Sequence, residues 1–253
     1  MTPDATQTER VAPVAESAPD ALRDLISRAR VVLWDFDGPI CRLFAGHSAE
    51  RVAAGLVAWL AEQGRQDLLT DAERKSADPH AVLRAVDRRS PRDGDRPADD
   101  GFVAALEERL TQEELRAVPK AMPTAYADPL IRTWTARGSR LAVTTNNSPR
   151  VVRTYLETRG LLGCFAPHIY GRTRDLGHLK PDPRFLHRAL SAMDAESGDA
   201  LMIGDTPSDL EAARRAGVPF LGYARNERKE RALREAGART VVTSLEQILQ
   251  PLR

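Results

Sequence analysis

The chain is short of several residue types, and each shortage excludes a class of protein. Only two of its 253 residues are cysteines, Cys41 and Cys164, which is too few for a disulfide framework, and neither has the spacing of zinc ligands. No apolar run approaches the roughly 20 residues needed to cross a bilayer. The first twenty residues carry no apolar signal core. We therefore expect a flexible tail over residues 1–20 and a cytoplasmic protein without a membrane partner.

An excess of charge of one sign is also missing. The 37 basic residues are balanced by 36 acidic ones, so we expect no nucleic-acid partner, because binding to a phosphate backbone needs a clustered positive surface. A charged content of 29% and a hydrophobic content of 42% are typical of a soluble globular enzyme. Lysine is scarce, since only four of the basic residues are lysines. Where a lysine does appear, a position that arginine could not fill is therefore slightly favoured.

One apolar run is followed directly by acidic residues. Residues 31–34, Val-Val-Leu-Trp, predict a strand buried on both faces, and Asp35, Asp37 and a Gly-Pro turn come after it. An ordinary strand followed by an acidic turn has the same spacing. Asp93-Gly94-Asp95 repeats the D-x-D pattern without an apolar run before it, so we interpret that copy as loop. The pattern gains meaning only from its place at a strand end.

The next part of the chain is helical, and the remainder alternates between strands and helices. Helices are predicted over residues 48–63, from Asp78-Pro79 through Val86, and over about 98–115, with a charged loop at 90–97. Further strands are predicted at residues 140–145, 168–170, 200–203, 219–223 and 240–242, and helices at 129–137, 149–158, 183–193, 208–216, 227–236 and from 244. This alternation predicts parallel βαβ units. The fold class is therefore α/β, with a parallel sheet interrupted after its first strand by a helical lid.

Polar groups follow three of the predicted strands and would meet at one edge of a parallel sheet. They are Asp35 and Asp37, then Thr144, Thr145 and Asn146, then Asp205 and Asp209. Four carboxylates in one place repel one another unless a cation is present, and oxygen ligands of this kind suit Mg²⁺. Lys180 precedes a predicted helix, where its ammonium could lie between a carboxylate and a phosphoryl oxygen; a solvent-exposed loop lysine is the alternative.

Four segments of the chain stand in the order and approximate spacing of the four motifs of the haloacid dehalogenase-like hydrolase superfamily. They are Asp35-Phe36-Asp37-Gly38, Thr145-Asn146, Lys180-Pro181-Asp182-Pro183 and Gly204-Asp205-Thr206-Pro207-Ser208-Asp209. The chain resembles that family over nearly its whole length except the tail, and four motifs in order are a specific signal. One departure is Pro39, which stands where the common pattern has threonine.

The resemblance implies a role for each matching residue. Asp35 would be the nucleophile that forms an aspartyl-phosphate, and Asp37 would act as the general acid and then as the general base. Thr145 and the backbone amide of Asn146 would hold the phosphoryl oxygens. Lys180 would neutralise charge on the nucleophile and the phosphate.

The resemblance also implies a Mg²⁺ site and a division into domains. Asp35, the backbone carbonyl of Asp37, Asp205 and Asp209 would hold the metal, the last directly or through water. The domains would be a Rossmann-like catalytic core at 21–43 and 124–253 and a helical cap at 44–123 that closes over it. Candidate substrate contacts at the entrance of the cap are Arg42, Phe44 and His47, and an anionic substrate tail could be bound by Arg88, Arg89, Arg92 and Arg96. For each of them, a surface or hinge residue is the alternative.

The function that the resemblance implies is phosphate ester hydrolysis, because dehalogenases and phosphonatases of the superfamily lack an aspartate at the position of Asp37. We therefore expect a Mg²⁺-dependent phosphatase that acts on a small phosphorylated metabolite, as a monomer or homodimer. A phosphomutase, which returns the phosphoryl group to a reoriented sugar, is the alternative among enzymes. A non-catalytic binding or regulatory protein is the other alternative, and the intact aspartates and Lys180 argue against it.

Overall fold

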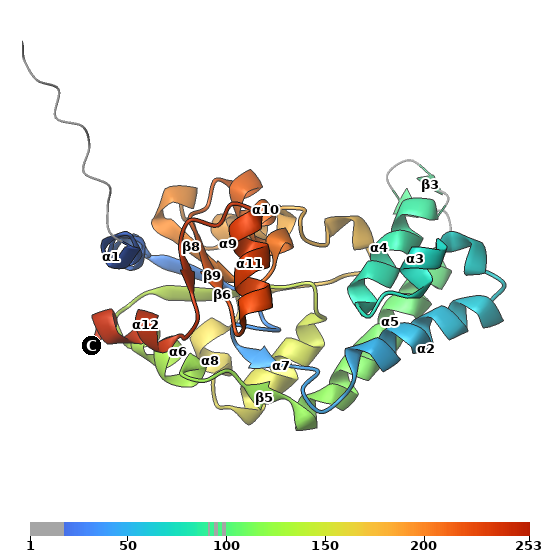
Figure 1. Ribbon diagram of the computed structural model, residues 1–253, viewed down its shortest axis with the longest axis horizontal. Helices are drawn as coiled ribbons and strands as arrows, with labels where there is room; N and C mark the ends of the chain where they lie inside the picture. The colour runs from blue at the N-terminus through green and yellow to red at the C-terminus, as the bar shows by residue number, and fades with distance from the viewer. Residues whose placement is uncertain (1–17, 91, 94–95, 98–99) are drawn as a thin grey trace, which may run out of the picture.

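The computed structural model describes residues 18–90, 92–93, 96–97 and 100–253 (Figure 1). Most of the predicted tail, residues 1–17, therefore lies outside the described part of the chain. The last three residues of that prediction, 18–20, belong to helix α1 (Ala18–Arg28). Gly94 and Asp95 of the second D-x-D pattern also lie outside the described residues.

The core is a six-stranded sheet in the order β10-β9-β8-β1-β6-β7, and every neighbouring pair is parallel. Its strands are β1 (Val31–Trp34), β6 (Arg140–Thr144), β7 (Ile169–Tyr170), β8 (Ala200–Gly204), β9 (Phe220–Tyr223) and β10 (Val241–Val242). The predicted α/β class with a parallel sheet is confirmed. The chain adds β6 and β7 on one side of β1 and then β8, β9 and β10 on the other. Ligands of open α/β sheets bind at such a switch point, outside the carboxyl ends of the strands.

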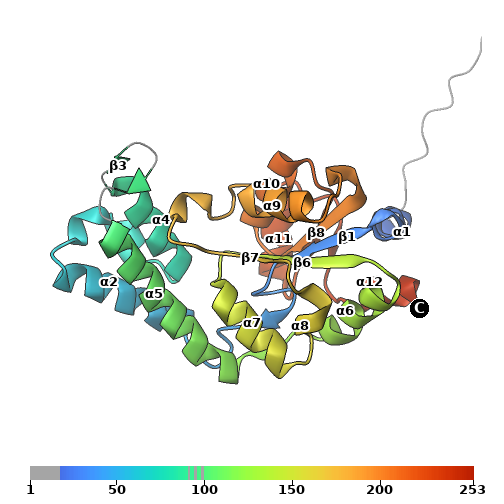
Figure 2. The ribbon, with the colours of Figure 1, turned by 180° about the vertical axis from the view of Figure 1, so that it is seen from behind.

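Helices cover both faces of this sheet (Figures 1 and 2). They are α6 (Ala127–Ala136), α7 (Pro149–Thr158), α8 (Leu162–Phe165), α9 (Arg184–Ala192), α10 (Pro207–Ala216), α11 (Glu227–Glu235) and α12 (Glu246–Leu249). The central strand alternates between the two layers. Val32 and Trp34 pack with α6, α7, α8 and α12, whereas Val31 and Leu33 pack with α9 and α10. Because β1 is apolar on both faces, it is fully buried and gives the residues after it a rigid base.

A separate group of helices lies beyond the carboxyl edge of the sheet (Figure 1). It consists of α2 (Ala49–Glu62), α3 (Asp71–Arg74), α4 (Pro79–Arg89) and α5 (Asp100–Ala117), which we call the helical insertion. Leu56, Leu83 and Leu106 belong to the apolar cluster that holds it together. A short ladder pairs β2 (Cys41–Arg42) with β5 (Met122–Pro123), where the chain leaves the core and returns to it. The domain boundaries at 43/44 and 123/124 remain a prediction.

Two parts of the insertion differ from the sequence prediction. The predicted charged loop at 90–97 contains a short antiparallel pair, β3 (Arg92–Asp93) with β4 (Arg96–Pro97). Helix α3 was not predicted at all. It is a single turn held by a capping box between Thr70 and Glu73, and one turn is too short to show helical periodicity.

In the described part of the chain, no helix is long and apolar enough to cross a membrane.

Candidate active site

The polar strand ends meet at the carboxyl edge of the sheet, as predicted. Asp35 follows β1, and Asp205 follows β8, which pairs with β1 in parallel. Asp209 lies in the first turn of α10, the helix that begins after β8. Carboxylate oxygens of these three aspartates all lie within 4.8 Å of one another, and all three side chains are buried. The fold therefore brings together the two halves of the predicted carboxylate cluster, which lie far apart in the sequence.

Lys180 contacts two of these three aspartates, Asp35 and Asp209. Its Nζ donates to Asp35 Oδ1 at 2.7 Å, lies 2.5 Å from Asp209 Oδ1, and donates to the Thr144 carbonyl at 2.9 Å. Its side chain is 2% exposed, so the interpretation as a solvent-exposed loop lysine is wrong. Burial alone would lower the pKa of Lys180, but the charges of Asp209 and Asp35 raise it above its ordinary value. The ammonium is therefore charged wherever the protein is folded near neutral pH.

Burial has the opposite effect on the nucleophile candidate. It raises the pKa of Asp35, and the charge of Lys180 works against that rise. The backbone amide of Asp35 donates to the Ile203 carbonyl at 2.9 Å, which fixes the residue to β8.

Asp209 is held by the start of its own helix. Its Oδ2 accepts hydrogen bonds from the backbone amides of Asp205 and Thr206, at 3.1 and 3.0 Å, and from the Thr206 hydroxyl at 2.7 Å. Thr206 and Asp209 form a capping box. A Cβ at Gly204 would lie 2.4 Å from Asp209 Cβ, so glycine is required for this close approach. The local sequence thus leaves Oδ1 of Asp209 directed at Lys180.

Asp37 lies beside the three-aspartate cluster, and its side chain is not part of it. Its Oδ1 accepts a hydrogen bond from the backbone amide of Leu43 at 2.8 Å. Burial raises the pKa of Asp37 to about 6, against the lowering effect of that hydrogen bond. The Thr124 hydroxyl donates to the Gly38 carbonyl at 2.6 Å and so ties the returning chain to this turn.

Lys229 is a residue of the site that the sequence analysis missed. It lies in the first turn of α11, whose N-cap is Asn226, and its ammonium donates to Asp205 Oδ2 and, at 3.4 Å, to the Asp205 carbonyl. Burial raises the pKa of Asp205 to about 7, and the charge of Lys229 opposes that rise. The scarcity of lysine was the signal that could have drawn attention to it.

The residues present fit a magnesium ion. Asp35, Asp205 and Asp209 supply hard oxygen donors within one ligand sphere, as Mg²⁺ prefers. Asp205 Oδ1 is buried and has no hydrogen-bond partner among the described residues. A Cβ at Gly38, where φ is +135°, would lie 2.2 Å from Asp205 Oδ2, so the turn packs its backbone directly against this carboxylate. A buried carboxylate oxygen without a partner is costly unless a cation or water satisfies it.

The loop after β6 contains the two predicted phosphate-binding residues. The Thr145 hydroxyl donates to the side-chain oxygen Oδ1 of Asn147 at 3.0 Å and accepts from the backbone amide of Asn147 at 3.2 Å. Asn146 Oδ1 accepts from the Lys180 backbone amide at 2.7 Å. Since Lys180 Nζ also donates to the Thr144 carbonyl, the loop and the lysine hold each other in place.

A pocket of about 400 Å³ opens beside Asp37 and Asp205. Its lining includes two of the predicted contact residues, Arg42 and Phe44, together with Arg225 and Lys229. His47 does not line it; its Nε2 lies 3.0 Å from Glu113 Oε2, and it borders a smaller pocket with Arg51 and Arg109.

The predicted arginine contacts of the insertion lie elsewhere. Arg88 and Arg89 both pair with Glu73, at 2.5 and 2.9 Å, and neither lines the pocket beside Asp37. The side chains of Arg92 and Arg96 lie outside the described part of the structure.

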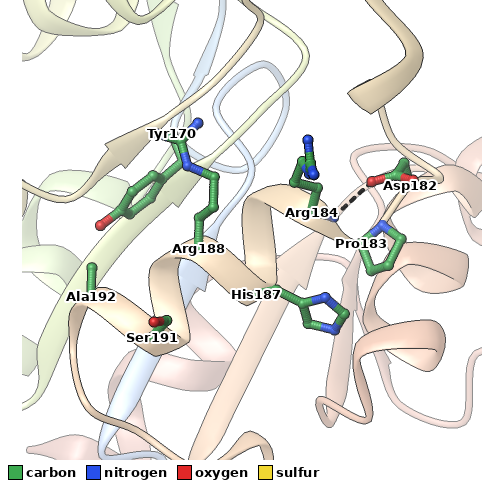
Figure 3. A pocket seen from close by; sticks show the side chains of 8 residues that line it. All are labelled: Tyr170, Asp182, Pro183, Arg184, His187, Arg188, Ser191 and Ala192. Atoms are coloured by element: carbon green, nitrogen blue, oxygen red, sulfur yellow. Dashed lines mark hydrogen bonds between the residues drawn. The ribbon is translucent and has the colours of Figure 1, made fainter. Parts of the chain in front are cut away.

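Another pocket, of about 620 Å³, is lined by helix α9 and the chain before it (Figure 3). Arg188 lies over the Tyr170 ring, 5.5 Å from its centroid, and Asp182 caps the backbone amide of Arg184 at 2.9 Å. The predicted catalytic and metal-binding aspartates do not line this pocket. The larger volume of a pocket therefore does not identify the chemical site here.

Comparison with known proteins decides the family. The profile of the haloacid dehalogenase-like hydrolases matches residues 29–217. The chain belongs to this family. A phosphoglycolate phosphatase of Rhodospirillum rubrum is 32% identical over 204 residues, which cover 78% of this chain and 81% of the relative. A phosphoserine phosphatase of Thermus thermophilus is 37% identical over 95 residues, covering 37% of each chain.

Solved structures of haloacid dehalogenase-like proteins share the fold. CbbY from Rhodobacter sphaeroides in complex with phosphate superposes with a TM-score of 0.61 at 22% identity, covering 88% of this chain and 99% of that one. The predicted family and the prediction of a hydrolase are confirmed. The roles of the individual residues remain predictions.

Proposed function

We propose that this hydrolase is a Mg²⁺-dependent phosphatase that hydrolyses the phosphate monoester of a small metabolite through an aspartyl-phosphate on Asp35. The observation that carries the proposal is the position of Lys180, which is buried and lies between Asp35 and Asp209. A fixed ammonium at this place offsets the negative charge that an attacking carboxylate and a phosphoryl group bring together. The phosphatases among the relatives support the same chemistry.

Two carboxylates would share the chemical steps. An oxygen of Asp35 attacks phosphorus, the bond from phosphorus to the ester oxygen breaks, and Asp37 gives its proton to the leaving alkoxide. Asp37 then removes a proton from water as the water oxygen attacks phosphorus. The bond from phosphorus to the Asp35 oxygen breaks, which releases orthophosphate and regenerates the Asp35 carboxylate. The raised pKa of Asp37, about 6, supports this role, because an acid that must also act as a base works best near the ambient pH.

The remaining residues would position the phosphoryl group. The Thr145 hydroxyl and the backbone amide of Asn146 would donate to its oxygens, and Lys180 would lie on the side of Asp35. When bound, Mg²⁺ would be held by Asp35, the Asp37 carbonyl, Asp205 and Asp209, the last directly or through water, and would supply positive charge beside the phosphoryl oxygens.

The first substrate that we propose is phosphoglycolate, the compound in the names of several relatives. The pocket beside Asp37 supports a small anionic leaving group, because Arg42, Arg225 and Lys229 line it with positive charge. Residues 44–123 would act as the cap over this pocket. A cytoplasmic location and a monomer or homodimer are further parts of the proposal.

The test is phosphate release from a panel of phosphate monoesters that includes phosphoglycolate, phosphoserine and sugar phosphates. Each is assayed with Mg²⁺ and with a chelator, beside the variant Asp35→Asn. We expect metal-dependent release from wild type and less than about a hundredth of it from the variant, with an unchanged unfolding temperature. Release by a folded Asp35→Asn protein would remove Asp35 as the nucleophile. Turnover of a sugar phosphate that needs a bisphosphate activator and releases little phosphate would favour the phosphomutase.

A further inference from the structure

Glu114 is a fully buried carboxylate in the helical insertion, near the end of α5, and its contacts reach into the core. Its Oε1 accepts from Asn147 Nδ2 at 2.9 Å, and its Oε2 accepts from the backbone amide of Ser148 at 3.1 Å. Asn147 and Ser148 directly follow Thr145 and Asn146, the predicted phosphate-binding residues. A residue of the insertion is thus built into the loop that would hold the phosphoryl group.

Arg172, which follows β7, contacts both Glu114 and the loop. Its guanidinium forms a two-pronged pair with Glu114, with Nη1 to Oε1 at 2.8 Å and Nη2 to Oε2 at 3.0 Å. Nη1 also donates to the Asn146 carbonyl at 2.8 Å, and the Arg172 backbone amide donates to the Asn147 carbonyl at 3.0 Å. Its Nη2 and Nε also donate to Thr111 Oγ1 and Glu107 Oε1, which lie on α5 like Glu114. The side chains of both Arg172 and Glu114 are 0% exposed.

Chemistry fixes the orientation of the Asn147 amide in this network. A carboxylate only accepts hydrogen bonds, so Glu114 requires the NH₂ group of Asn147 to point toward it. The oxygen of that amide must then point the other way, toward the Thr145 hydroxyl, which donates to it at 3.0 Å. The charge on Glu114 therefore holds the Asn147 side chain and, through the Ser148 amide, the backbone of the loop. The Thr145 hydroxyl has a single proton, so on binding it would turn that proton from Asn147 Oδ1 to a phosphoryl oxygen.

We propose that Glu114 is a positioning residue of the phosphate site, so that the inserted helix α5 completes the phosphate-binding loop of the core. This inference rests on the proposed function, because it assumes that Thr145 and Asn146 bind a phosphoryl group. A buried ion pair stabilises a fold little, since the cost of removing both charges from water offsets their attraction. A role in docking alone is served by Glu108, which joins the same helix to α7 through Arg150 at 2.7 Å on the surface.

The experiment compares Glu114→Gln with the matched control Glu108→Gln. Glutamine at position 114 keeps the size of the side chain but replaces one acceptor oxygen with a donor. It cannot accept from both Asn147 Nδ2 and the Ser148 amide, so the loop that carries Thr145 and Asn146 loses one of its two anchors on α5. Steady-state hydrolysis of p-nitrophenyl phosphate gives kcat and KM, and inhibition by orthophosphate gives Ki. We expect KM and Ki to rise about tenfold in Glu114→Gln with kcat changed less, and no change in either constant in Glu108→Gln. A purely structural role lowers the folded fraction, and hence kcat, and leaves KM and Ki as they are.

A second variant keeps the test decisive if Glu114→Gln does not fold. Asn147→Ala leaves the Arg172–Glu114 pair intact and removes the side-chain hydrogen bond by which the loop is anchored to Glu114, so it should raise Ki by a similar factor. In the double variant the two effects should not multiply, because both break the same connection. An unchanged Ki in folded Glu114→Gln or Asn147→Ala, with an active wild type, overturns the positioning role alone. A wild type that neither hydrolyses phosphate esters nor binds orthophosphate overturns the proposed function and this inference together.

Discussion

The Lys180 ammonium donates a hydrogen bond of 2.7 Å to Asp35, a residue 145 positions earlier in the chain. The same ammonium lies 2.5 Å from Asp209, so one buried positive charge is shared by two carboxylates. A compact ammonium fits between them, whereas a guanidinium is planar and longer. The position explains why one of the four lysines of an arginine-rich chain is found here.

Lys180→Arg should therefore lose most of the phosphatase activity. The planar group cannot approach Asp35, Asp209 and the Thr144 carbonyl together, and we expect a fall in kcat of at least about 100-fold, the usual effect of removing one charge-stabilising donor. Phosphate release measures the loss, and Lys75→Arg, at the end of helix α3, is the control. A fully active Lys180→Arg enzyme would remove Lys180 from the site.

Lys229→Met should bind Mg²⁺ more tightly than wild type. The Lys229 ammonium contacts Asp205, and a positive charge beside a proposed metal ligand opposes the entry of a second cation. Two unit charges about 4 Å apart interact by roughly 1–4 kcal/mol between bulk water and a protein surface, so we expect the Kd for Mg²⁺ to fall about tenfold. Titration calorimetry measures this without any turnover, with Lys75→Met as the control. An unchanged Kd would show that Lys229 does not compete with the metal.

Gly38→Ala should disturb both stability and metal binding. A Cβ at this position would lie 2.2 Å from Asp205 Oδ2, and φ is +135°, a conformation that alanine rarely adopts. We expect the free energy of unfolding to fall by about 1–3 kcal/mol and Mg²⁺ to bind more weakly. Gly163→Ala is the matched control, because a Cβ there would meet nothing within 4 Å. Equal affinities of the two variants for Mg²⁺ would contradict the close packing of this turn against Asp205.

The stability of the protein should depend on pH through Glu114. Burial would raise the pKa of this carboxyl, but the charge of Arg172 lowers it from 4.5 to about 2. A pKa that is lower in the folded state contributes stability above pH 4.5, and that contribution is lost as the pH falls toward 2. The difference between the unfolded and folded pKa of Glu114, about two and a half units, corresponds to at most roughly 3 kcal/mol in the free energy of unfolding.

Urea unfolding of wild type and Glu114→Gln between pH 3 and pH 6 isolates this contribution, because every other titrating group is common to both proteins. His80 Nε2 lies 3.3 Å from Glu114 and Glu107 pairs with Arg172, so both belong to the same network. The free-energy difference between the two proteins should shrink as the pH falls. A difference that is constant across this range would show that Glu114 titrates normally.

The layout of the core could be predicted from the sequence. An apolar run such as residues 31–34 predicts a buried strand because it is short, contains β-branched residues and is followed by polar residues and a Gly-Pro turn. Parallel pairing then placed Asp35 and Asp205 at the same edge of the sheet, and the order of the motifs gave the family. These features are local, or follow from the connection rules of parallel sheets, so a single sequence carries them.

Which long polar side chains enter the site could not be predicted from the sequence, because it depends on packing between distant segments. Lys229 contacts Asp205, whereas His47, nearer in sequence to the first motif, pairs with Glu113 instead. Arg172 is one of many arginines and stands in no periodic pattern, yet it is fully buried against Glu114 from the helical insertion. Such pairs depend on how the insertion packs against the core, and a charged residue that ends in a buried pair looks the same in sequence as one that faces water.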